Sequence, residues 1–317
     1  MFRLRGAVLP TVIAASALTL AGCGATGGSG GEGIEGIEVL ASIYPLAYVA
    51  AQVGGDLVTV SIATPAGTDP HAIELSPRQL RDVGEADLVV YLRDFQAAFD
   101  EAVDERAPEH ALDVATVADL LPLPQGAADE HGDAHADEAE DEDAHGGLDP
   151  HFWLDPERLA AAARAIADDL AHIDPDHAQT YRANAGVLAN TLATLDDEYA
   201  DGLGTCESDV VVTSHAAFGY LTERYGLRQV SVSGIDPEGE PSPARIREVR
   251  ETIADLGVTA VFTEPLADPA VAATLAEDLG VEVLQLDPLD SHAQDAPDYR
   301  DVMAANLDAL RTGLGCS

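Results

Sequence analysis

The sequence predicts an α/β protein with two lobes, each a mostly parallel sheet flanked by helices, joined by one long rigid helix. Short apolar runs rich in Val, Ile and Leu alternate with segments whose apolar residues recur every three or four positions, a pattern typical of parallel sheets covered by helices. Residues 87–92 hold a continuous apolar run, as expected for a strand buried on both faces. A helical pattern over residues 176–203 provides the connection, on the order of 40 Å long.

Composition limits the classes of function. The chain has 317 residues, of which 46% are hydrophobic, enough for one large or two medium domains with packed cores. Its formal net charge of −41 argues against nucleic acid as a partner, because phosphate backbones are neutralised by Lys and Arg. Such an acidic surface favours cations instead.

The N-terminus has the three regions of a secretory signal. Arg3 and Arg5 precede an apolar run over residues 7–20 that is too short for a stable transmembrane helix. The next residues, Leu20-Ala21-Gly22-Cys23, resemble the end of a bacterial lipoprotein signal, which is cut before the cysteine that receives the lipid. An ordinary signal cut elsewhere is the alternative. We expect a signal peptide at 1–22, a lipid on Cys23, a flexible tether at 23–36 and a protein anchored to the outer face of the cell membrane.

The first lobe is expected over residues 38–175. Ser76 and Pro77 predict a helix start, because Ser caps helices and Pro is preorganised for the first helical position. Strands are expected at 37–43, 57–62, 87–92 and 111–114, and helices at 46–53, 77–83, 95–106 and 156–173, the last capped by Asp155.

Residues 127–147 interrupt this pattern with an acidic, histidine-rich segment that contains no large apolar residue. Such a segment buries too little surface to offset the entropy of ordering, so we expect a disordered loop. Its His131, His135 and His145 have two interpretations: a solvated charge run, or a loose collector of cations that feeds a tighter site.

The second lobe is expected over residues 204–317, after the linking helix at 176–203. Strands are expected at 209–213, 229–232, 260–263 and 281–286, and helices at 217–225, 243–256, 267–279 and 299–314. In sheets of this kind, ligands gather at the carboxyl ends of the strands.

Three histidines lie at segment ends where a metal site is expected. His71 and His151 each follow an Asp-Pro pair, and His215 follows a Val-rich strand. Imidazole nitrogen and carboxylate oxygen are ligands that zinc favours, usually four in all. Taken singly, each histidine is more simply a hydrogen-bonded loop residue. Together, in rigid turns that lower the ordering cost of binding, they predict one metal centre.

The fourth ligand is left open between Asp287 and Asp290, which follow the last predicted strand. Glu74 is a further acid near His71, and either aspartate also suits a turn or helix cap. His292 is less favoured, and His110, His172 and His177 are interpreted as surface residues.

Cys206 and Cys316 remain after the expected cleavage. An exported protein meets an oxidising compartment, so an even pair predicts one disulfide. The alternative is two free thiols that act as soft metal ligands.

Five motifs carry a family resemblance: Gly67-Thr68-Asp69-Pro70-His71, Asp149-Pro150-His151-Phe152-Trp153-Leu154-Asp155, Ser214-His215-Ala216-Ala217-Phe218-Gly219-Tyr220, Pro237-Glu238-Gly239-Glu240-Pro241-Ser242-Pro243 and Phe262-Thr263-Glu264-Pro265-Leu266. With them, residues 38 to about 315 resemble the zinc-binding solute-binding lipoproteins of bacterial ABC metal-uptake systems, solute-binding protein family 9.

The resemblance implies a metal held in the cleft between the lobes. It implies His71 and His151 as ligands from the first lobe, and His215 with a carboxylate from the second. Manganese-type relatives carry Glu at the position of His215, which favours Zn²⁺ over Mn²⁺. Relatives differ at the fourth position, some using a carboxylate that matches Asp287, some one that matches Asp290, and some water.

We therefore expect the extracytoplasmic component of an ABC transporter. It would capture Zn²⁺ as a monomer and deliver it to a membrane permease with its ATPase, without being an enzyme. A manganese-binding member of the family is one alternative. A zinc hydrolase is another, because zinc on three histidines activates water, but no His-Glu-x-x-His motif is present. Adhesion is a further role that the resemblance suggests.

Overall fold

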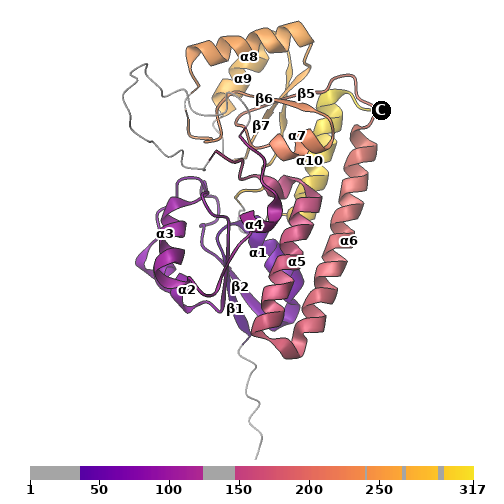
Figure 1. Ribbon diagram of the computed structural model, residues 1–317. Helices are drawn as coiled ribbons and strands as arrows, with labels where there is room; N and C mark the ends of the chain where they lie inside the picture. The colour runs from indigo at the N-terminus through magenta and orange to yellow at the C-terminus, as the bar shows by residue number, and fades with distance from the viewer. Residues whose placement is uncertain (1–35, 124–146, 240, 266–268, 292–295) are drawn as a thin grey trace, which may run out of the picture. The chain divides into compact units, whose positions relative to one another are not determined.

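Two parallel sheets form the frame of the protein (Figure 1). The computed structural model describes residues 36–123, 147–239, 241–265, 269–291 and 296–317. These residues belong to one compact unit that begins at Gly36. Each sheet has four strands among the described residues, and neighbouring strands pair in parallel, so the predicted α/β class is confirmed.

The first sheet has the strand order β2-β1-β3-β4. Its strands are β1 (Ile37–Ala41), β2 (Val58–Ile62), β3 (Leu88–Tyr91) and β4 (Ala111–Asp113). Leu88 and Val90 of the buried strand β3 pack in one cluster and Val89 and Tyr91 in another, as the alternation of side chains requires. Helices α1 (Tyr44–Gly54) and α5 (Pro156–Ile173) cover the first face, and α2 (Pro77–Glu85) and α3 (Ala97–Arg106) the second.

The second sheet repeats this design in the order β6-β5-β7-β8. Its strands are β5 (Val210–Thr213), β6 (Arg228–Ser231), β7 (Ala260–Thr263) and β8 (Glu282–Gln285). Helix α10 (Tyr299–Leu314) covers the face that carries Val211 and Phe262. Helices α8 (Pro243–Leu256) and α9 (Pro269–Leu279) cover the face of Val210 and Val212.

Helix α6 (Ala178–Leu203) connects the two halves of the chain, after a 3₁₀ turn at Pro175–His177. Its 26 residues correspond to about 39 Å at 1.5 Å per residue. It packs along α5 and α10, with its buried face formed by Tyr181, Ala185, Leu188, Leu192, Leu195, Tyr199 and Leu203. The predicted long linking helix is therefore confirmed.

Capping residues fix the starts of α2, α5, α8 and α10 where the sequence predicts them. Ser76 and Gln79 form a capping box at α2, and Asp155 accepts a hydrogen bond from the Glu157 N–H at α5. Five other helices begin two residues away from the predicted start: α1, α3, α6, α9 and α7 (Gly219–Arg224). Helix α1 begins at Tyr44 rather than at 46, with Pro45 in its first turn, where no backbone donor is needed.

Helix α7 begins at Gly219 rather than at 217 because residues 216–218 still form the turn from the sheet. Shorter elements not predicted are α4 (Ala115–Ala118) and the 3₁₀ turns Gly55–Leu57 and Phe152–Leu154.

Cys206 and Cys316 form a disulfide. It ties the segment after α6 to the segment after α10, where the backbone N–H groups of Glu207 and Ser208 also donate to the Leu314 carbonyl. The structure thus has the predicted pair and not the two free thiols.

No helix in the described part of the chain is both long and apolar enough to cross a membrane. The predictions for the signal peptide 1–22, the tether and Cys23 lie outside the described residues, apart from Gly36 at the end of the tether. So do the predictions for His131, His135, His145 and His292.

Candidate metal centre

Four side chains from distant parts of the sequence converge. His71, His151, His215 and Asp290 each offer one ligand atom, and these atoms all lie within 4.8 Å of one another. The imidazole ring centroids are 5.3 Å apart for His71 and His151, and 5.4 Å apart for His151 and His215. The structure therefore brings together the three predicted histidines and one of the two predicted aspartates.

His71 is presented by the loop that follows β2. The Asp69 carboxylate accepts a hydrogen bond from the His71 backbone N–H at 2.9 Å, which fixes the Asp-Pro-His turn. Gln96 holds the loop from the buried side by donating to the Pro70 carbonyl at 3.0 Å. Phe95 meets the His71 ring edge-on, with centroids 4.8 Å apart.

His151 is fixed by Asp149, which is only 1% exposed. One carboxylate oxygen of Asp149 lies 3.0 Å from the His151 backbone N and 2.9 Å from its Nδ1. Because a carboxylate only accepts, we assign the proton to Nδ1, and the lone pair of Nε2 is left for a metal.

His215 lies just beyond β5 and is held by Glu264 from just beyond the neighbouring strand β7. One Glu264 oxygen accepts from the His215 backbone N–H at 3.1 Å, and the other lies 2.5 Å from Nδ1. Burial alone would lower the pKa of His215, but the Glu264 carboxylate outweighs it and the pKa is raised. His215 thus repeats the orientation of His151, with Nδ1 on a carboxylate.

Asp290 is the acid that joins the cluster. Its Oδ2 lies 4.0 Å from His71 Nε2, and the residue is 7% exposed. Burial raises the pKa of Asp290 to about 7, with His215 opposing the shift. A buried carboxyl group with a pKa this high gains from a cation beside it.

Asp287 lies outside the cluster and shapes the turn that presents Asp290. Its carboxylate accepts from the Leu289 N–H at 2.8 Å. Leu289 has a φ of 61°, in the left-handed region that costs a non-glycine residue about 1 to 2 kcal/mol. Trp153 holds the same turn by donating from Nε1 to the Pro288 carbonyl at 2.8 Å.

The other candidate residues stay apart from the cluster. Glu74 and His172 are exposed, and His177 contacts Asp174 at 2.6 Å. His110 is half-buried and also outside the metal-binding group. Of the three histidines interpreted as surface residues, His172 is exposed, whereas His110 and His177 are half-buried.

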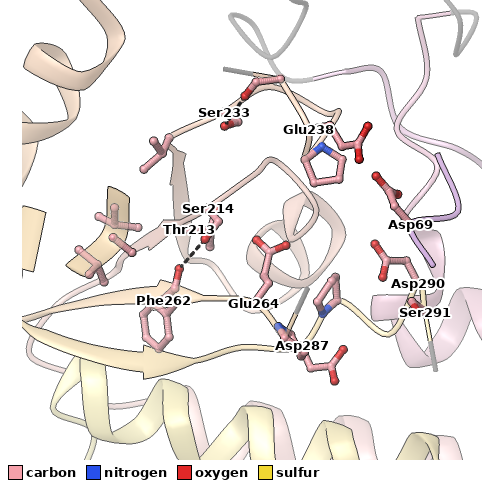
Figure 2. A pocket seen from close by; sticks show the side chains of 18 of the residues that line it. Asp69, Thr213, Ser214, Ser233, Glu238, Phe262, Glu264, Asp287, Asp290 and Ser291 are labelled. Carbon is pink, nitrogen blue, oxygen red and sulfur yellow. Dashed lines mark hydrogen bonds between the residues drawn. The ribbon is translucent and has the colours of Figure 1, made fainter. Parts of the chain in front are cut away.

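A cavity of about 930 Å³ adjoins the cluster. Figure 2 shows the carboxyl groups of Asp69, Glu238 and Asp290 gathered on one side of it, with that of Asp287 apart from them. These carboxylates come from separate loops and create a negative potential on their side of the cavity, which we call the acidic opening. This potential attracts divalent cations and repels anions.

The donor set matches one particular kind of ion. Three imidazole nitrogens and one carboxylate oxygen suit zinc, whereas manganese and magnesium favour oxygen-rich sites. The carboxylates on Nδ1 of His151 and His215 are the outer partners that metal-ligating histidines usually have.

Comparison with known proteins agrees with this geometry. The model of the family described as zinc-uptake complex component A, periplasmic (ZnuA), matches residues 39–313. The chain belongs to this family.

Two curated relatives show the extent of the similarity. The zinc-binding lipoprotein AdcA of Streptococcus pneumoniae (strain ATCC BAA-255 / R6) is 33% identical over 278 residues, which are 86% of this chain and 55% of AdcA. The chain thus spans about half the length of that relative. The high-affinity zinc uptake system protein ZnuA of Bacillus subtilis is 30% identical over 310 residues, 96% of each chain.

Solved structures share the fold. The Zn(II)-bound ZnuA-like domain of Streptococcus pneumoniae AdcA has a TM-score of 0.72 at 31% identity, covering 88% of this chain and 99% of that one. The laminin-binding protein Lbp of Streptococcus pyogenes has a TM-score of 0.74 at 28% identity, covering 88% and 100%.

Two orienting residues were not predicted as such: Glu264 had no expected role, and Asp149 was expected only to stiffen a turn. For Glu264 a signal was present, since it directly follows a predicted strand, like His215, and parallel strands end at one sheet edge. Trp153 is buried, and its hydrogen bond to the turn before Asp290 has no signal in the neighbouring sequence.

Proposed function

We propose that this protein is the extracytoplasmic solute-binding component of an ABC transporter that takes up zinc. Zn²⁺ would bind to His71, His151, His215 and Asp290 and then pass to a membrane permease driven by its ATPase. The observation that carries the proposal is the convergence of these four ligand atoms within 4.8 Å. Membership of the zinc-uptake family supports the same cargo.

Capture depends on groups that are already in place. Asp149 and Glu264 hold Nδ1 of His151 and His215, so the Nε2 atoms of these two rings are oriented for binding before the metal arrives. Little side-chain entropy is then lost on binding, which favours affinity. The acidic opening at Asp69 and Glu238 raises the local concentration of cations.

Capture rather than catalysis is favoured by the ligand count. A catalytic zinc keeps an open position for water, whereas three histidines and one aspartate complete a tetrahedral set. Assays of ester and peptide hydrolysis by the zinc-loaded protein test the hydrolase alternative, and we expect no turnover above that of free zinc.

Attachment to the membrane through a lipid on Cys23 and a monomeric state are part of the proposal. The AdcA relative is described as a lipoprotein, which supports the anchor. Adhesion also stays a prediction, supported by the laminin-binding proteins among the similar structures. Binding of the protein to laminin-coated surfaces tests it.

The acidic segment with His131, His135 and His145 is proposed as a collector of loosely held zinc. Deletion of residues 128–146 should lower the number of zinc ions bound and leave the tight site intact. If the tight site disappeared as well, the collector role would be wrong.

The direct test of the function is metal content and competition. We expect about one tightly bound zinc per chain, displaced poorly by manganese, and impaired growth in low zinc when the gene is deleted. Tighter binding of manganese than of zinc would contradict the proposal.

A further inference from the structure

The start of helix α7 contacts the residue that orients His151. This helix (Gly219–Arg224) begins in the second lobe, shortly after the ligand His215. Its first two residues, Gly219 and Tyr220, both lie against Asp149, which belongs to the first-lobe segment leading to His151. The contact therefore joins the segments of two proposed ligands.

Residue 219 must be glycine because Asp149 leaves no room for a side chain there. A Cβ atom on residue 219 would lie 2.7 Å from Asp149 Oδ2, closer than real Cβ contacts occur. The neighbour is a buried carboxylate that already bonds to His151, so it has little freedom to move aside. The missing side chain is what lets Asp149 occupy its position.

Tyr220 fixes the backbone of the same residue. Its hydroxyl donates to the Asp149 carbonyl at 2.6 Å and accepts from the Leu121 N–H at 2.8 Å. The Asp149 N–H in turn donates to the Leu121 carbonyl at 2.8 Å. Tyr220 is buried, with the Arg158 guanidinium 5.1 Å from its ring centroid, so this hydroxyl is held firmly.

The two contacts hold Asp149 at both ends. Tyr220 fixes its carbonyl and Gly219 leaves room for its carboxylate, and that carboxylate then bonds to the backbone N and Nδ1 of His151. A displacement of Asp149 therefore becomes a rotation or shift of the His151 ring.

We propose that Gly219 and Tyr220 are positioning residues for zinc binding, acting through Asp149 to fix the imidazole of His151. This inference rests on the proposed zinc site. It adds that a first-lobe ligand is oriented by the second lobe, on the same segment that carries His215. The motif from Ser214 to Tyr220 thus has two tasks, supplying one ligand and aligning another.

The expected effect follows from the precision that metal sites need. Ligands must be held within about 0.5 Å of the productive geometry. An alanine at Gly219 must move Asp149 outward by several tenths of an ångström to reach even a tight contact. Loss of an outer partner of a ligating histidine typically costs roughly 10- to 100-fold in metal affinity.

The experiment uses two variants with matched controls. Gly219→Ala is paired with Gly186→Ala, a helical glycine where an added methyl group would meet nothing within 4 Å. Tyr220→Phe is paired with Tyr199→Phe, whose buried hydroxyl donates to the Met303 carbonyl at 2.7 Å, away from the site. For each protein we would measure zinc affinity by chelator competition, the visible spectrum of the Co²⁺ form, and the ¹⁵N shifts of the metal-free His151 ring.

Gly219→Ala should lower zinc affinity by about 10-fold or more, and Tyr220→Phe by a smaller factor. Both should change the Co²⁺ spectrum and the His151 shifts, while the two controls match the wild type. If Gly219→Ala fails to fold, Tyr220→Phe decides the question. Unchanged affinity, spectrum and His151 shifts in the folded variants would overturn the inference. Failure of the wild type to bind zinc would instead remove the proposed function, and the metal-free His151 shifts still test the positioning contact.

Discussion

The protein contains two Asp-Pro-His turns that share a backbone geometry and differ in their surroundings. In both, the aspartate accepts a hydrogen bond from the histidine backbone N–H, at 2.9 Å for Asp69 and His71 and 3.0 Å for Asp149 and His151. Asp149 is buried and also bonds to the His151 ring. Asp69 is half-buried, faces the cavity in Figure 2, and its Oδ2 accepts no hydrogen bond from the described residues.

The difference shows what the tripeptide does and what the fold adds. Asp-Pro-His builds the turn by itself, because the aspartate side chain reaches the N–H two residues ahead. Orientation of the ring requires that the aspartate be enclosed, and α7 of the other lobe encloses only Asp149. We therefore expect His151 to be a fixed ligand and Asp69 to act mainly through its charge at the opening.

The largest effect is expected from removing the fixed ligand. His151→Ala should weaken zinc binding more than about 100-fold, beyond the usual cost of losing an outer partner, while the fold survives. Isothermal titration measures the affinity and circular dichroism the fold. His172→Ala, an exposed histidine on α5, is the control and should bind zinc like the wild type. Unchanged affinity in His151→Ala would remove this residue from the site.

A smaller effect should separate the two turns directly. Asp149→Asn should lower zinc affinity roughly 10- to 100-fold, because the ring loses its charged partner. Asp69→Asn should cost less than about fivefold, the value of a half-exposed charge. In both variants the side-chain oxygen still accepts the hydrogen bond from the histidine backbone N–H. Zinc affinities from competition titrations therefore report the effect of the lost carboxylate charge. Equal losses of zinc affinity in the two variants would show that Asp69 and Asp149 contribute to zinc binding in the same way.

The smallest effect is a difference in pH dependence. Zinc must displace the protons of its ligands, so affinity should fall as the pH is lowered, by about tenfold per pH unit for each proton released. The pKa of about 7 for Asp290 places part of this loss near neutral pH, and the raised pKa of His215 moves its own part to higher pH than for an ordinary imidazole. The variant Asp290→Asn lacks one of these protons, so the affinity of this variant for zinc should change less steeply between about pH 8 and pH 6. An equally steep profile would mean that Asp290 does not exchange its proton for zinc.

Much of the fold is predictable because its signals are local. Helices α5, α8 and α10 have the predicted bounds, since a capping residue opens each of them: Asp155, Ser242 and Asp298. The start of α7 was not predictable, because residues 216–218 are as apolar as a helix but turn back against the sheet.

The metal site likewise has a part that was predictable from the sequence and a part that was not. The three histidines were predictable because each follows a rigid turn or a strand end. Asp290 could not be separated from Asp287, because the choice depends on the left-handed backbone at Leu289. The orienting contacts join residues far apart in sequence, 49 positions for Glu264 and His215 and 71 for Tyr220 and Asp149, and no local pattern encodes them.

The most direct test of the zinc site is X-ray absorption at the zinc edge of the protein loaded with one zinc ion. The structure predicts four ligands at about 2.0 to 2.2 Å, with the scattering pattern of three imidazoles and one oxygen. Sulfur scattering at about 2.3 Å, or fewer than three imidazoles, would contradict the proposed centre.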